Sequence, residues 1–426
     1  MHSIKDIRQD PEEFRKQLLR RNETVDVDEL LELDRKRREL TSQLDELRRM
    51  RNTVSKKIGG AKKSGQDTED LQVKMRMLGE GLKVGEIEEK RLAEAIYQRL
   101  MAIPNIPDDS TPEGADSREN VVVAHWGEPP TFDFDLLDHL TLAEQLGILD
   151  FPRGGKITGS GFPVWSGAGA LLERALLNFM LDIQTREHGY REMITPFLGN
   201  RESMIGSGQI PHLEDDMYHC DKDDLFLIPT SEVMLVNLHR GEILSEDQLP
   251  IRYTANSPCF RREAGSWGRD TRGFQRTHQF NKVEMVRLEK PEDAGEALEQ
   301  LIRHAETILR RLDLHYRTVH LCGGDLPFQA STCYDLEVWA PADGGRWLEV
   351  SSCSNCGTFQ AQRASIRYRP KTGKTEYVHT LNGSGLATSR LMVALIETYQ
   401  TEEQSFAIPP VLRPYMGGIS AITVSE

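Results

Sequence analysis

A heptad repeat in the first hundred residues constrains the fold of this chain more than any other feature of its sequence. Seven of the nine seam positions between Leu30 and Ile58 are apolar, which is the pattern of a coiled coil and not of a general amphipathic helix. The a positions are Leu30, Arg37, Leu44, Arg51 and Ile58, and the d positions are Leu33, Leu40, Leu47 and Val54. The repeat predicts a long helix over residues 27–58.

The same pattern returns after a break that contains glycines. Gly59, Gly60 and Gly65 interrupt the repeat, which resumes with Leu71, Met75, Leu78, Leu82, Leu92 and Ile96. Two heptad helices joined by a short Gly/Lys loop predict an antiparallel α-helical hairpin, with an arm of about 48 Å at about 1.5 Å per residue. Three glycines inside the second helix, Gly79, Gly81 and Gly85, have no explanation in the sequence, since each costs about 1 kcal/mol relative to alanine.

A run of basic residues lies at the far end of the predicted arm. Residues 48–66 contain seven basic residues and no acid, namely Arg48, Arg49, Arg51, Lys56, Lys57, Lys62 and Lys63. A solvated basic face and a coiled coil used only for dimerisation are alternatives. An antiparallel hairpin satisfies its own seam, however, and uncompensated positive charge attracts phosphates. The pattern therefore favours an arm that reaches a distant polyanion.

Length and composition are typical of a globular protein with more than one domain. The chain has 426 residues, enough for two or three domains, of which 38% are hydrophobic and 28% charged. Its net charge of −14 argues against bulk nucleic-acid binding outside the basic stretch. No run approaches about 18 apolar residues, and the first residues lack the apolar core of a secretory signal. Six sparse cysteines predict reduced thiols, a cytoplasmic location and no membrane partner.

The part of the chain beyond the arm is predicted to mix helices and strands. Five prolines in residues 101–130 indicate a linker, and Asp10-Pro11-Glu12-Glu13 indicates a short helix over residues 10–21. Further helices are expected at 171–187 and 291–312, and strands at 224–228, 283–288, 315–320, 334–339 and 347–351. Because these elements do not alternate regularly, we expect an α+β domain with a mainly antiparallel sheet.

The common nucleotide-binding and nucleophile signatures are missing from the sequence. It contains no G-x-x-x-x-G-K-[ST], no G-x-G-x-x-G after a strand and no G-x-S-x-G elbow. Residues 260–284 instead predict two strands joined by a long loop with several arginines. Strand alternation would place Arg261 and Glu263 on one face and Arg262 on the other, and an arginine at a strand end can bind a phosphate bidentately. A surface hairpin without function is the alternative.

Three segments, in this order, resemble the motifs of class II aminoacyl-tRNA synthetases. Residues 186–196, which end in Tyr-Arg-Glu-Met-Ile-Thr-Pro, resemble motif 1. Residues 259–284 resemble motif 2, and their strings Arg-Glu-Ala-Gly-Ser, Arg-Asp-Thr-Arg-Gly and His-Gln-Phe-Asn-Lys-Val-Glu are similar to the seryl members specifically. Residues 383–396, which contain Gly-Leu-Ala-Thr-Ser-Arg, resemble motif 3. With the hairpin included, the resemblance to bacterial-type seryl-tRNA synthetases covers nearly the whole chain.

This resemblance implies an architecture and a reaction. It implies an N-terminal tRNA-binding domain over residues 1–107 and a class II catalytic domain over residues 108–426, in a homodimer. The expected reaction activates L-serine with ATP and Mg²⁺ to seryl-adenylate and transfers the seryl group to tRNA(Ser), with tRNA(Sec) left open as a second acceptor. The seven basic arm residues would contact tRNA together with Arg269 and Arg272.

The resemblance also implies roles for individual residues. The expected catalytic residues are Arg261 at the ATP α-phosphate and the serine carboxylate, Glu349, which would hold Mg²⁺ with Ser352, and Arg390 on the γ-phosphate side. Glu263 would contact the adenine amino group and Phe280 would stack on the ring. The expected ATP-binding residues are Arg261, Arg262, Glu263, Phe280, Glu349, Val350, Ser351, Ser352 and Arg390. The expected serine-binding residues are Thr230, Ser231, Glu232, Arg261, Glu284, Thr380, Asn382 and Ser384.

Chemistry supports a serine pocket of this kind and limits the alternatives. The ammonium group of serine needs carboxylates to balance its charge. Buried polar groups that bind the serine hydroxyl also discriminate against alanine, because alanine would leave them unpaired. Another class II synthetase, such as the threonyl or prolyl enzyme, is expected to carry an anticodon-binding domain after motif 3, where 36 residues follow Arg390. A tRNA-binding regulator and a carrier-protein ligase also remain open, but Arg261, Glu349 and Arg390 argue against the first and the basic arm against the second.

A C-x-x-C pair raises the question of zinc. Cys353 and Cys356 are separated by two residues, which is a spacing that zinc ligands use. A structural zinc needs about four ligands, however, and the sequence offers no second C-x-x-C or H-x-x-x-H partner. We therefore expect two buried free thiols and no zinc.

Overall fold

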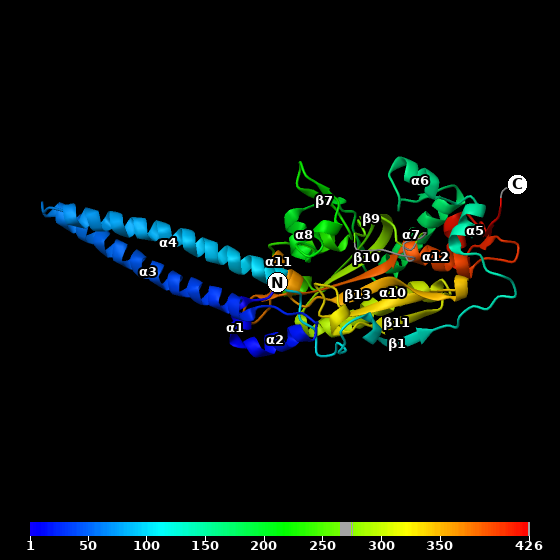
Figure 1. The fold of residues 1–426 in the computed structure, drawn as a ribbon, viewed down its shortest axis with the longest axis horizontal. Coiled ribbons are helices and arrows are strands. Elements are labelled where there is room, and N and C mark those ends of the chain that lie inside the picture. Colours follow the sequence, from blue (N-terminus) through cyan, green and yellow to red (C-terminus); the bar gives the residue numbers. More distant parts are fainter. Residues whose placement is uncertain (265–273, 275, 425–426) are drawn as a thin grey trace. The chain divides into compact units, whose positions relative to one another are not determined.

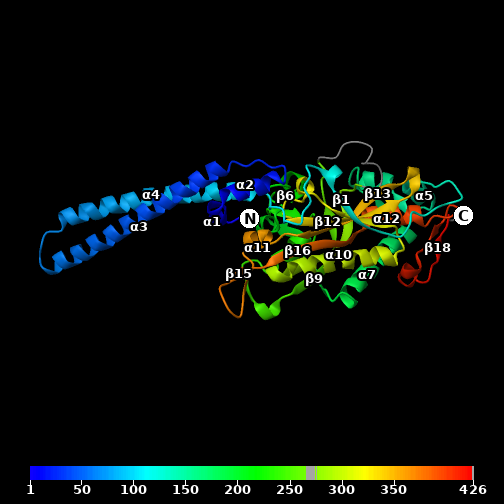
Figure 2. The same ribbon diagram turned by 90° about the horizontal axis from the view of Figure 1, so that it is seen from below.

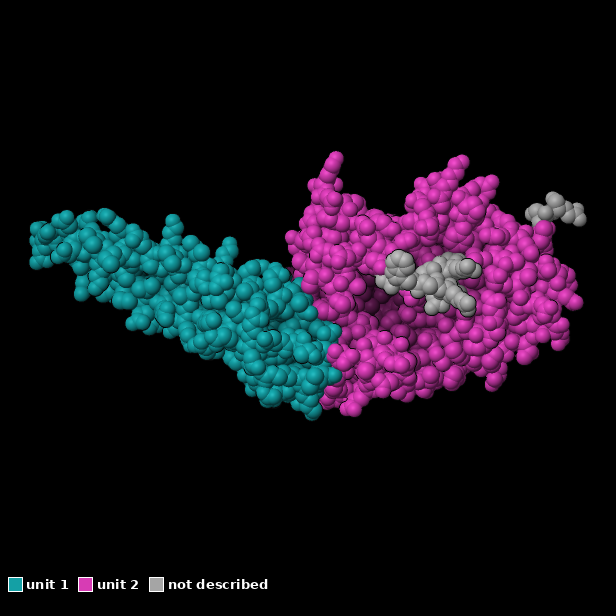
Figure 3. Space-filling model, in the orientation of Figure 1, with its two compact units in different colours: residues 1–19, 23–104 teal, residues 20–22, 105–426 magenta. Residues whose placement is uncertain are grey.

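The protein divides into two compact units. The structure, a computed structural model, describes residues 1–264, 274 and 276–424. The first unit comprises residues 1–19 and 23–104, and the second comprises residues 20–22 and 105–426 (Figures 1 and 3). Within the described residues, no helix combines the length and the apolar character needed to cross a lipid bilayer.

Four helices build the first unit: α1 (Ile4–Gln9), α2 (Pro11–Leu19), α3 (Val27–Lys63) and α4 (Glu69–Ala102). Helices α3 and α4 lie side by side in opposite directions, which confirms the predicted antiparallel hairpin (Figure 1). The buried seam contains Leu30, Leu44 and Val54 from α3 and Leu78, Leu82, Leu92 and Ile96 from α4. With 37 residues, α3 is about 55 Å long at about 1.5 Å per residue.

The first arm helix continues beyond its predicted end. Gly59 and Gly60 lie inside α3, which ends at Lys63, so the predicted break was wrong. A glycine inside a helix costs only about 1 kcal/mol, which a long packed hairpin tolerates. Gly65 follows the C-cap of the helix with a φ of +68°, which favours glycine, and the amides of Gly65 and Gln66 donate to carbonyls of the last turn at 3.3 and 3.0 Å.

One of the three glycines in α4 has a packing reason. A Cβ atom at Gly85 would lie 2.5 Å from Cδ2 of Leu44, so the missing side chain lets this seam leucine sit against the backbone of α4. A Cβ at Gly81 would make only an ordinary contact of 3.8 Å with Leu47, and one at Gly79 would have no neighbour within 4 Å. Nothing in the structure explains these two glycines.

An eight-stranded sheet is the frame of the second unit. Its strand order is β1 (Val121–Trp126), β11 (Tyr316–His320), β12 (Thr332–Ala340), β13 (Arg346–Asn355), β16 (His379–Ala387), β10 (Gln279–Glu289), β9 (Ile251–Phe260) and β4 (Arg191–Glu192). Neighbouring strands run antiparallel except β4 and β9, which run parallel. The predicted α+β class with a mainly antiparallel sheet is confirmed.

Helices and short strands surround this sheet. The helices are α5 (His139–Gln145), α6 (Phe151–Ile157), α7 (Ala168–Arg186), α8 (Arg201–Ser207), α9 (Glu232–Asn237), α10 (Ala294–Arg311), α11 (Phe359–Ala364) and α12 (Thr388–Thr398). The short strands are β2 (Leu149–Asp150), β3 (Val164–Trp165), β5 (Leu198–Asn200), β6 (His219–Cys220), β7 (Leu225–Leu227), β8 (Ile243–Ser245), β14 (Arg367–Arg369), β15 (Glu376–Tyr377), β17 (Phe406–Ala407) and β18 (Ala421–Ile422). The predicted helices near residues 171–187 and 291–312 are confirmed as α7 and α10.

Helices α7 and α10 cover one face of the sheet (Figure 2). Two glycines of β16 allow their close approach: a Cβ at Gly383 would lie 3.1 Å from Leu301 of α10, and one at Gly385 would lie 2.9 Å from Gln184 of α7. The main apolar core lies between this face and the helices, and it includes Met285 of β10.

Part of the opposite face of the sheet is covered by smaller elements. Val286 and Leu288 of β10 pack there with Leu235 of α9 and with α11, in a second apolar cluster. Because side chains alternate along a strand, Glu284 points to the same face as Val286. Glu284 and the alternate residues that precede it on β10 therefore point to the part of this face where the pocket lies.

Candidate active site

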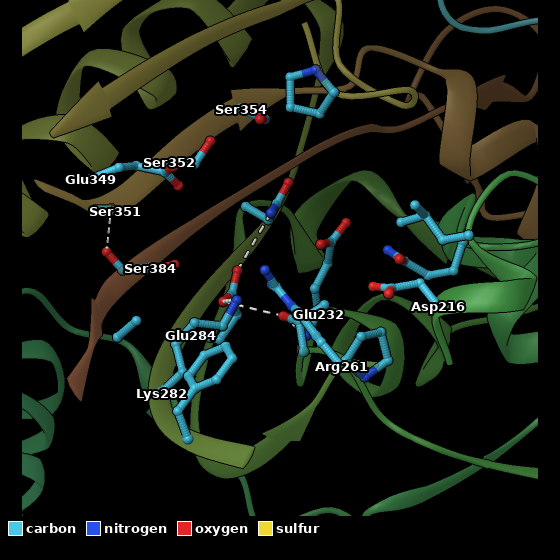
Figure 4. Close-up of a pocket in the computed structure, with 18 of the residues that line it drawn as sticks. Asp216, Glu232, Arg261, Lys282, Glu284, Glu349, Ser351, Ser352, Ser354 and Ser384 are labelled. Carbon is cyan, nitrogen blue, oxygen red and sulfur yellow. Dashed lines mark hydrogen bonds and ion pairs between the residues drawn. The ribbon is translucent and has the colours of Figure 1, made fainter. Parts of the chain in front are cut away.

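A cavity of about 590 Å³ opens on the sheet face opposite α7 and α10 (Figure 4). Phe280, Lys282 and Glu284 of β10 line it, as their spacing of two residues requires. In the antiparallel register Glu284 lies directly opposite Ser384 of β16, and Asn382 lies on the same face two residues away. Strand pairing therefore gathers polar side chains from segments about a hundred residues apart.

The carboxylate of Glu284 is buried and is held by three side chains. Lys282 Nζ lies 2.5 Å from Glu284 Oε2, and the Thr230 hydroxyl donates to the same oxygen at 3.3 Å. The Asn382 amide donates to Oε1 at 3.4 Å. Both members of the Lys282–Glu284 ion pair are buried, so removing one would leave an uncompensated charge in the interior.

Glu232, at the start of α9, is a second buried carboxyl in this pocket. Burial, together with the negative charge of Glu284, raises the pKa of Glu232 to about 7. A hydrogen bond from the Gln360 amide, 2.6 Å long, and the positive charges of Lys282 and Arg261 act in the opposite direction. Glu232 therefore titrates near neutral pH, and a bound cation would favour its ionised form.

Arg261 approaches the two carboxyl groups from the end of β9. Figure 4 shows Arg261, Lys282, Glu232 and Glu284 clustered on one side of the pocket. The Arg261 guanidinium carbon lies 5.3 Å from the centre of the Phe280 ring, a distance at which cation and aromatic face attract each other. One positive group thus stands between the acidic end of the pocket and an aromatic ring.

The two adjacent arginines separate as predicted, but not for the predicted reason. β9 ends at Phe260, so strand alternation does not extend over residues 261–263, and Glu263 has a left-handed φ of +54°. Asp216 holds this turn, because its carbonyl accepts from the Arg262 amide at 2.9 Å and its carboxylate from the Ala264 amide at 3.0 Å. The prediction that strand alternation extends to Glu263 was wrong.

Arg262 turns away from the cavity. Its Nε donates to the carbonyl of Met217 at 3.0 Å, and its guanidinium lies 5.1 Å from the centre of the Tyr218 ring. Arg261 and Glu263 line the cavity, whereas Arg262 does not. The structure therefore does not bring Arg262 together with the other expected ATP-binding residues.

A second end of the pocket is marked by Arg390 and Glu349. Arg390 lies in the first turn of α12, and its Nη1 donates to the carbonyl and to Oε2 of Glu349, both at 3.1 Å. The side chains are 27% and 46% exposed, so this ion pair contributes little to stability. Val350, Ser351 and Ser352 line the adjacent wall, and the Ser351 hydroxyl donates to the carbonyl of Ser384 at 2.6 Å.

Two expected serine-binding residues lie behind the wall of the pocket. Thr380 is fully buried, and its hydroxyl donates to Oε1 of Gln360 at 2.6 Å. Ser231 is also fully buried, and its hydroxyl has no hydrogen-bond partner among the described residues. Neither residue lines the cavity, so direct contact of either one with a ligand there is not supported by the geometry.

Several pocket residues were missed by the sequence analysis. Arg276, Thr277 and Lys282 line the cavity, and Arg276 forms a 3.0 Å ion pair with Glu263. Lys282 could have been found, because it lies two residues before Glu284 on the predicted strand. Gln360 gave no signal in the sequence, since it comes from a helix 128 residues away from its partner Glu232.

The basic stretch of the arm is only partly uncompensated. Arg48 pairs with Asp45 and with Glu86 of α4, both at 3.0 Å, so the expectation of free charge was wrong for this residue. The other six basic residues are exposed, and no ion pair involves them within the part of the chain that the structure describes: Arg49, Arg51, Lys56, Lys57, Lys62 and Lys63. Arg269 and Arg272, the other expected tRNA contacts, lie outside the described residues.

The C-x-x-C pair is buried. Cys353 and Cys356 are both free thiols in the interior, as expected. Burial raises the pKa of Cys353 to about 12 and that of Cys356 well above its usual value, so neither is a ready thiolate ligand. Among the described residues no group of three or more His, Cys, Asp or Glu side chains is arranged to hold a metal ion.

Comparison with known proteins first gives the class. Residues 216–399 match the family described as "tRNA synthetase class II core domain (G, H, P, S and T)", and residues 1–107 match the "Seryl-tRNA synthetase N-terminal domain". The pocket is built on the antiparallel sheet, between the β9–β10 hairpin and the turn from β16 into α12. The fold and the site define a class II aminoacyl-tRNA synthetase.

Similarity over the full chain then gives the family. The serine–tRNA ligase of Chlorobaculum parvum is 50% identical over 426 residues, covering 98% of this chain and 99% of that protein. The serine–tRNA ligase of Carboxydothermus hydrogenoformans is 50% identical over 419 residues, covering 98% of each. The crystal structure of Pyrococcus horikoshii seryl-tRNA synthetase complexed with ATP is 37% identical, with a TM-score of 0.93 over 100% of both chains. The chain belongs to the seryl-tRNA synthetase family.

Proposed function

We propose that the cavity on β9, β10, β13 and β16 activates L-serine with ATP and that the seryl group is then transferred to tRNA(Ser). The observation that supports this best is the distribution of charge in the pocket. Two buried carboxyl groups, Glu232 and Glu284, lie beside Arg261 at one end, and Arg390 lies at the other. The first end suits an amino acid, and the second suits a polyphosphate.

Charge balance in the acidic end explains how it would bind serine. Lys282 neutralises one of the two carboxylates, which leaves one negative charge to meet the serine ammonium. Thr230 links the start of α9 to Glu284: its side-chain oxygen accepts from the backbone amide of Glu232 at 3.2 Å, and its hydroxyl donates to the Glu284 carboxylate. Arg261 would bind the serine carboxylate, and the side chains of Asn382 and Ser384 would satisfy the serine hydroxyl.

The activation step needs no nucleophilic side chain. The serine carboxylate oxygen would form a bond to the α-phosphorus of ATP while the bond to the bridging oxygen breaks and pyrophosphate leaves. Arg261 would stabilise the charge that builds on the α-phosphate, and Arg390 would bind the γ-phosphate side. Glu263 and Phe280 would contact adenine at the amino group and at the ring face.

The oxygen ligands of β13 fit a magnesium ion. Glu349 offers a half-exposed carboxylate and Ser352 a hydroxyl on the same wall of the pocket. Magnesium prefers oxygen ligands, takes few of them from protein and fills its remaining positions with water and phosphate. Glu349 and Ser352 would hold the ion, and it would supply positive charge that neutralises part of the phosphate charge. Arg390 now holds Glu349, and it would exchange this carboxylate for phosphate when ATP enters.

The rest of the chain would serve tRNA binding and assembly. Residues 1–107 would bind tRNA through the basic arm, and residues 108–426 would catalyse the reaction. The motif 1 segment would form the interface of a homodimer, because its Ile194 is 90% exposed and the neighbouring Phe197 and Leu198 are also exposed. Reduced buried thiols suit a cytoplasmic enzyme.

Serine-dependent exchange of pyrophosphate into ATP tests this function directly. The purified protein is expected to catalyse exchange with L-serine and to show little activity with threonine or proline. Alanine should also be a poor substrate, because the missing hydroxyl leaves buried polar groups unpaired. Exchange that depends on threonine or proline instead of serine would overturn the proposed substrate.

The serine KM is expected to rise by about tenfold between about pH 8 and about pH 6. The folded-state pKa of Glu232 is about 7, above the ordinary value for glutamate, so the carboxyl group becomes protonated as the pH falls through neutrality. A neutral Glu232 cannot balance the serine ammonium, and binding weakens on the acidic side. Steady-state exchange across this pH range measures the effect, with the ATP KM as internal control. A serine KM that stays flat would show that Glu232 does not bind the ammonium.

Exchange activity is also expected to require Mg²⁺, and Glu349→Gln should raise the Mg²⁺ concentration for half-maximal activity by about tenfold or more. Glu337 is the matched control: it lies opposite Glu349 on β12, but it pairs with Arg317 and does not line the pocket. Glu337→Gln should leave the Mg²⁺ dependence unchanged. Elemental analysis should find no stoichiometric zinc, and about one zinc per chain would revive the cysteine-ligand hypothesis.

A further inference from the structure

A fully buried amide stands directly behind the acidic end of the pocket. Gln360 of α11 has no exposed surface and does not line the cavity. Its nitrogen donates to Oε1 of Glu232 at 2.6 Å and to the carbonyl of Ser207 at 2.9 Å, and its oxygen accepts from the hydroxyl of Thr380 at 2.6 Å. Three side chains thus form one chain of hydrogen bonds, from Thr380 through Gln360 to Glu232.

The chemistry of its partners fixes which end of the amide faces Glu232. A carbonyl oxygen and a carboxylate are both acceptors, so the group between them must be the NH₂ of Gln360. A flipped amide would set its own oxygen against the Ser207 carbonyl and the Glu232 carboxyl group, which leaves acceptors unpaired in the interior. The hydroxyl of Thr380 holds the opposite, carbonyl end and completes the arrangement.

The Gln360 amide binds a carboxyl group, that of Glu232, whose surroundings favour its neutral form. Glu232 is buried and lies near the negative charge of Glu284, both of which disfavour its ionised form. The positive groups that face it are Lys282 and Arg261, and the buried thiol of Cys356 lies close enough to be affected by its charge. Gln360 is the neutral donor that binds Glu232 directly, and it engages the carboxylate from the side away from the cavity.

We propose that Gln360 is a positioning residue for serine activation, which aims the Glu232 carboxylate at the ammonium of serine, and that Thr380 orients Gln360. This inference rests on the proposed function, because it assigns the ammonium to Glu232. It also gives Thr380 a role that agrees with its position behind the pocket wall. Gln360 touches neither serine nor ATP, so it acts entirely through Glu232.

Gln360→Met tests the proposal, because methionine keeps the length and approximate volume of glutamine but has no N–H donor. Loss of a hydrogen bond to a charged group is expected to raise the serine KM by about tenfold to a hundredfold, with the ATP KM changed by less than about threefold. The pH midpoint of the serine KM should move toward alkaline pH, since the amide favours the ionised form of Glu232. Gln362→Met is the matched control on the same helix, because the side-chain amide of Gln362 donates to the hydroxyl of Thr358 at 2.9 Å and Gln362 does not line the cavity.

The Thr380 end of the hydrogen-bond chain gives an independent test that does not disturb α11. Thr380→Val removes the hydroxyl with little change in shape and should raise the serine KM in the same direction as Gln360→Met. Thr380→Ser restores a hydroxyl and should recover most of that loss. This pair decides the matter if Gln360→Met does not fold.

Three results would overturn the proposal. They are equal rises in the serine and ATP KM values of Gln360→Met, an unshifted pH midpoint in that variant, and Thr380→Val and Thr380→Ser behaving alike. A wild-type enzyme without serine-dependent exchange would instead overturn the proposed function itself. The two failures are therefore distinguishable.

Discussion

Replacing Arg261 by alanine is expected to slow serine-dependent pyrophosphate exchange by about 10²–10³, which corresponds to about 3–4 kcal/mol in the activation step. Negative charge builds on the α-phosphate as the serine carboxylate attacks, and a fixed guanidinium there stabilises the transition state more than the ground state. Arg261 is held in place by the Phe280 ring and by the hydrogen-bonded end of the β9–β10 hairpin, where its amide donates to the carbonyl of His278 at 3.0 Å.

The neighbouring arginine supplies the control. Arg262→Ala should change exchange by less than about tenfold, because Arg262 does not line the cavity and its guanidinium is held by the carbonyl of Met217 and the ring of Tyr218. Arg261→Lys should recover only part of the activity, since lysine lacks the planar fork that binds a carboxylate or phosphate through two N–H groups. An Arg262 defect as large as the Arg261 defect would show that the wrong arginine has been assigned to the α-phosphate.

The fold was predictable where a local pattern repeats or a strand alternates. The heptad seam specifies a hairpin because an apolar stripe with this period must pack against another helix. Along β10 the spacing of Phe280 and Glu284 correctly places both on one face, and Lys282 between them follows by the same rule. In these segments the geometry of a single element decides which way the side chains point.

The errors occurred where contacts from distant parts of the chain override a local rule. The alternation argument failed at Glu263 because Asp216, about fifty residues earlier, holds the chain in a turn immediately after β9. Gly59 and Gly60 remain helical because the hairpin supplies packing that an isolated helix lacks. Neither effect can be predicted from the local sequence at these positions.

The pocket's supporting residues were the hardest part to predict. Thr380 was assigned to direct serine binding, but the structure inserts Gln360 between it and Glu232. A hydrogen-bond chain of this kind needs α11, β16 and α9 to meet in space, and no spacing along the sequence indicates that meeting. Family resemblance names residues that belong to a site, whereas only packing decides which of them touch the ligand and which act through a neighbour.

Deleting residues 30–96 is expected to abolish tRNA charging while serine-dependent exchange remains largely intact. The chain ends left by the deletion lie close together, because Glu29 and Arg99 form an ion pair across the base of the hairpin, so a short Gly/Ser linker can join them. The arm belongs to a separate compact unit, and the residues that line the pocket all belong to the other. Loss of its exposed cations should reduce tRNA charging efficiency by about a hundredfold or more at physiological salt.

A charge variant separates loss of phosphate contacts from loss of the arm as a support. Neutralising Arg49, Arg51, Lys56 and Lys57 together should weaken tRNA binding and reduce the slope of log affinity against log salt by about 0.7–0.9 for each phosphate contact removed. Neutralising Arg35 and Lys36 is the matched control, because these two cations of the same helix already pair with Glu32 and Glu39. Charging of tRNA(Ser), with tRNA(Sec) measured beside it, reports the outcome. The arm would support the fold rather than bind tRNA through its cationic end if exchange fell as far as charging in the deletion variant. The same conclusion would follow if the four-residue variant and the two-residue control gave the same salt slope.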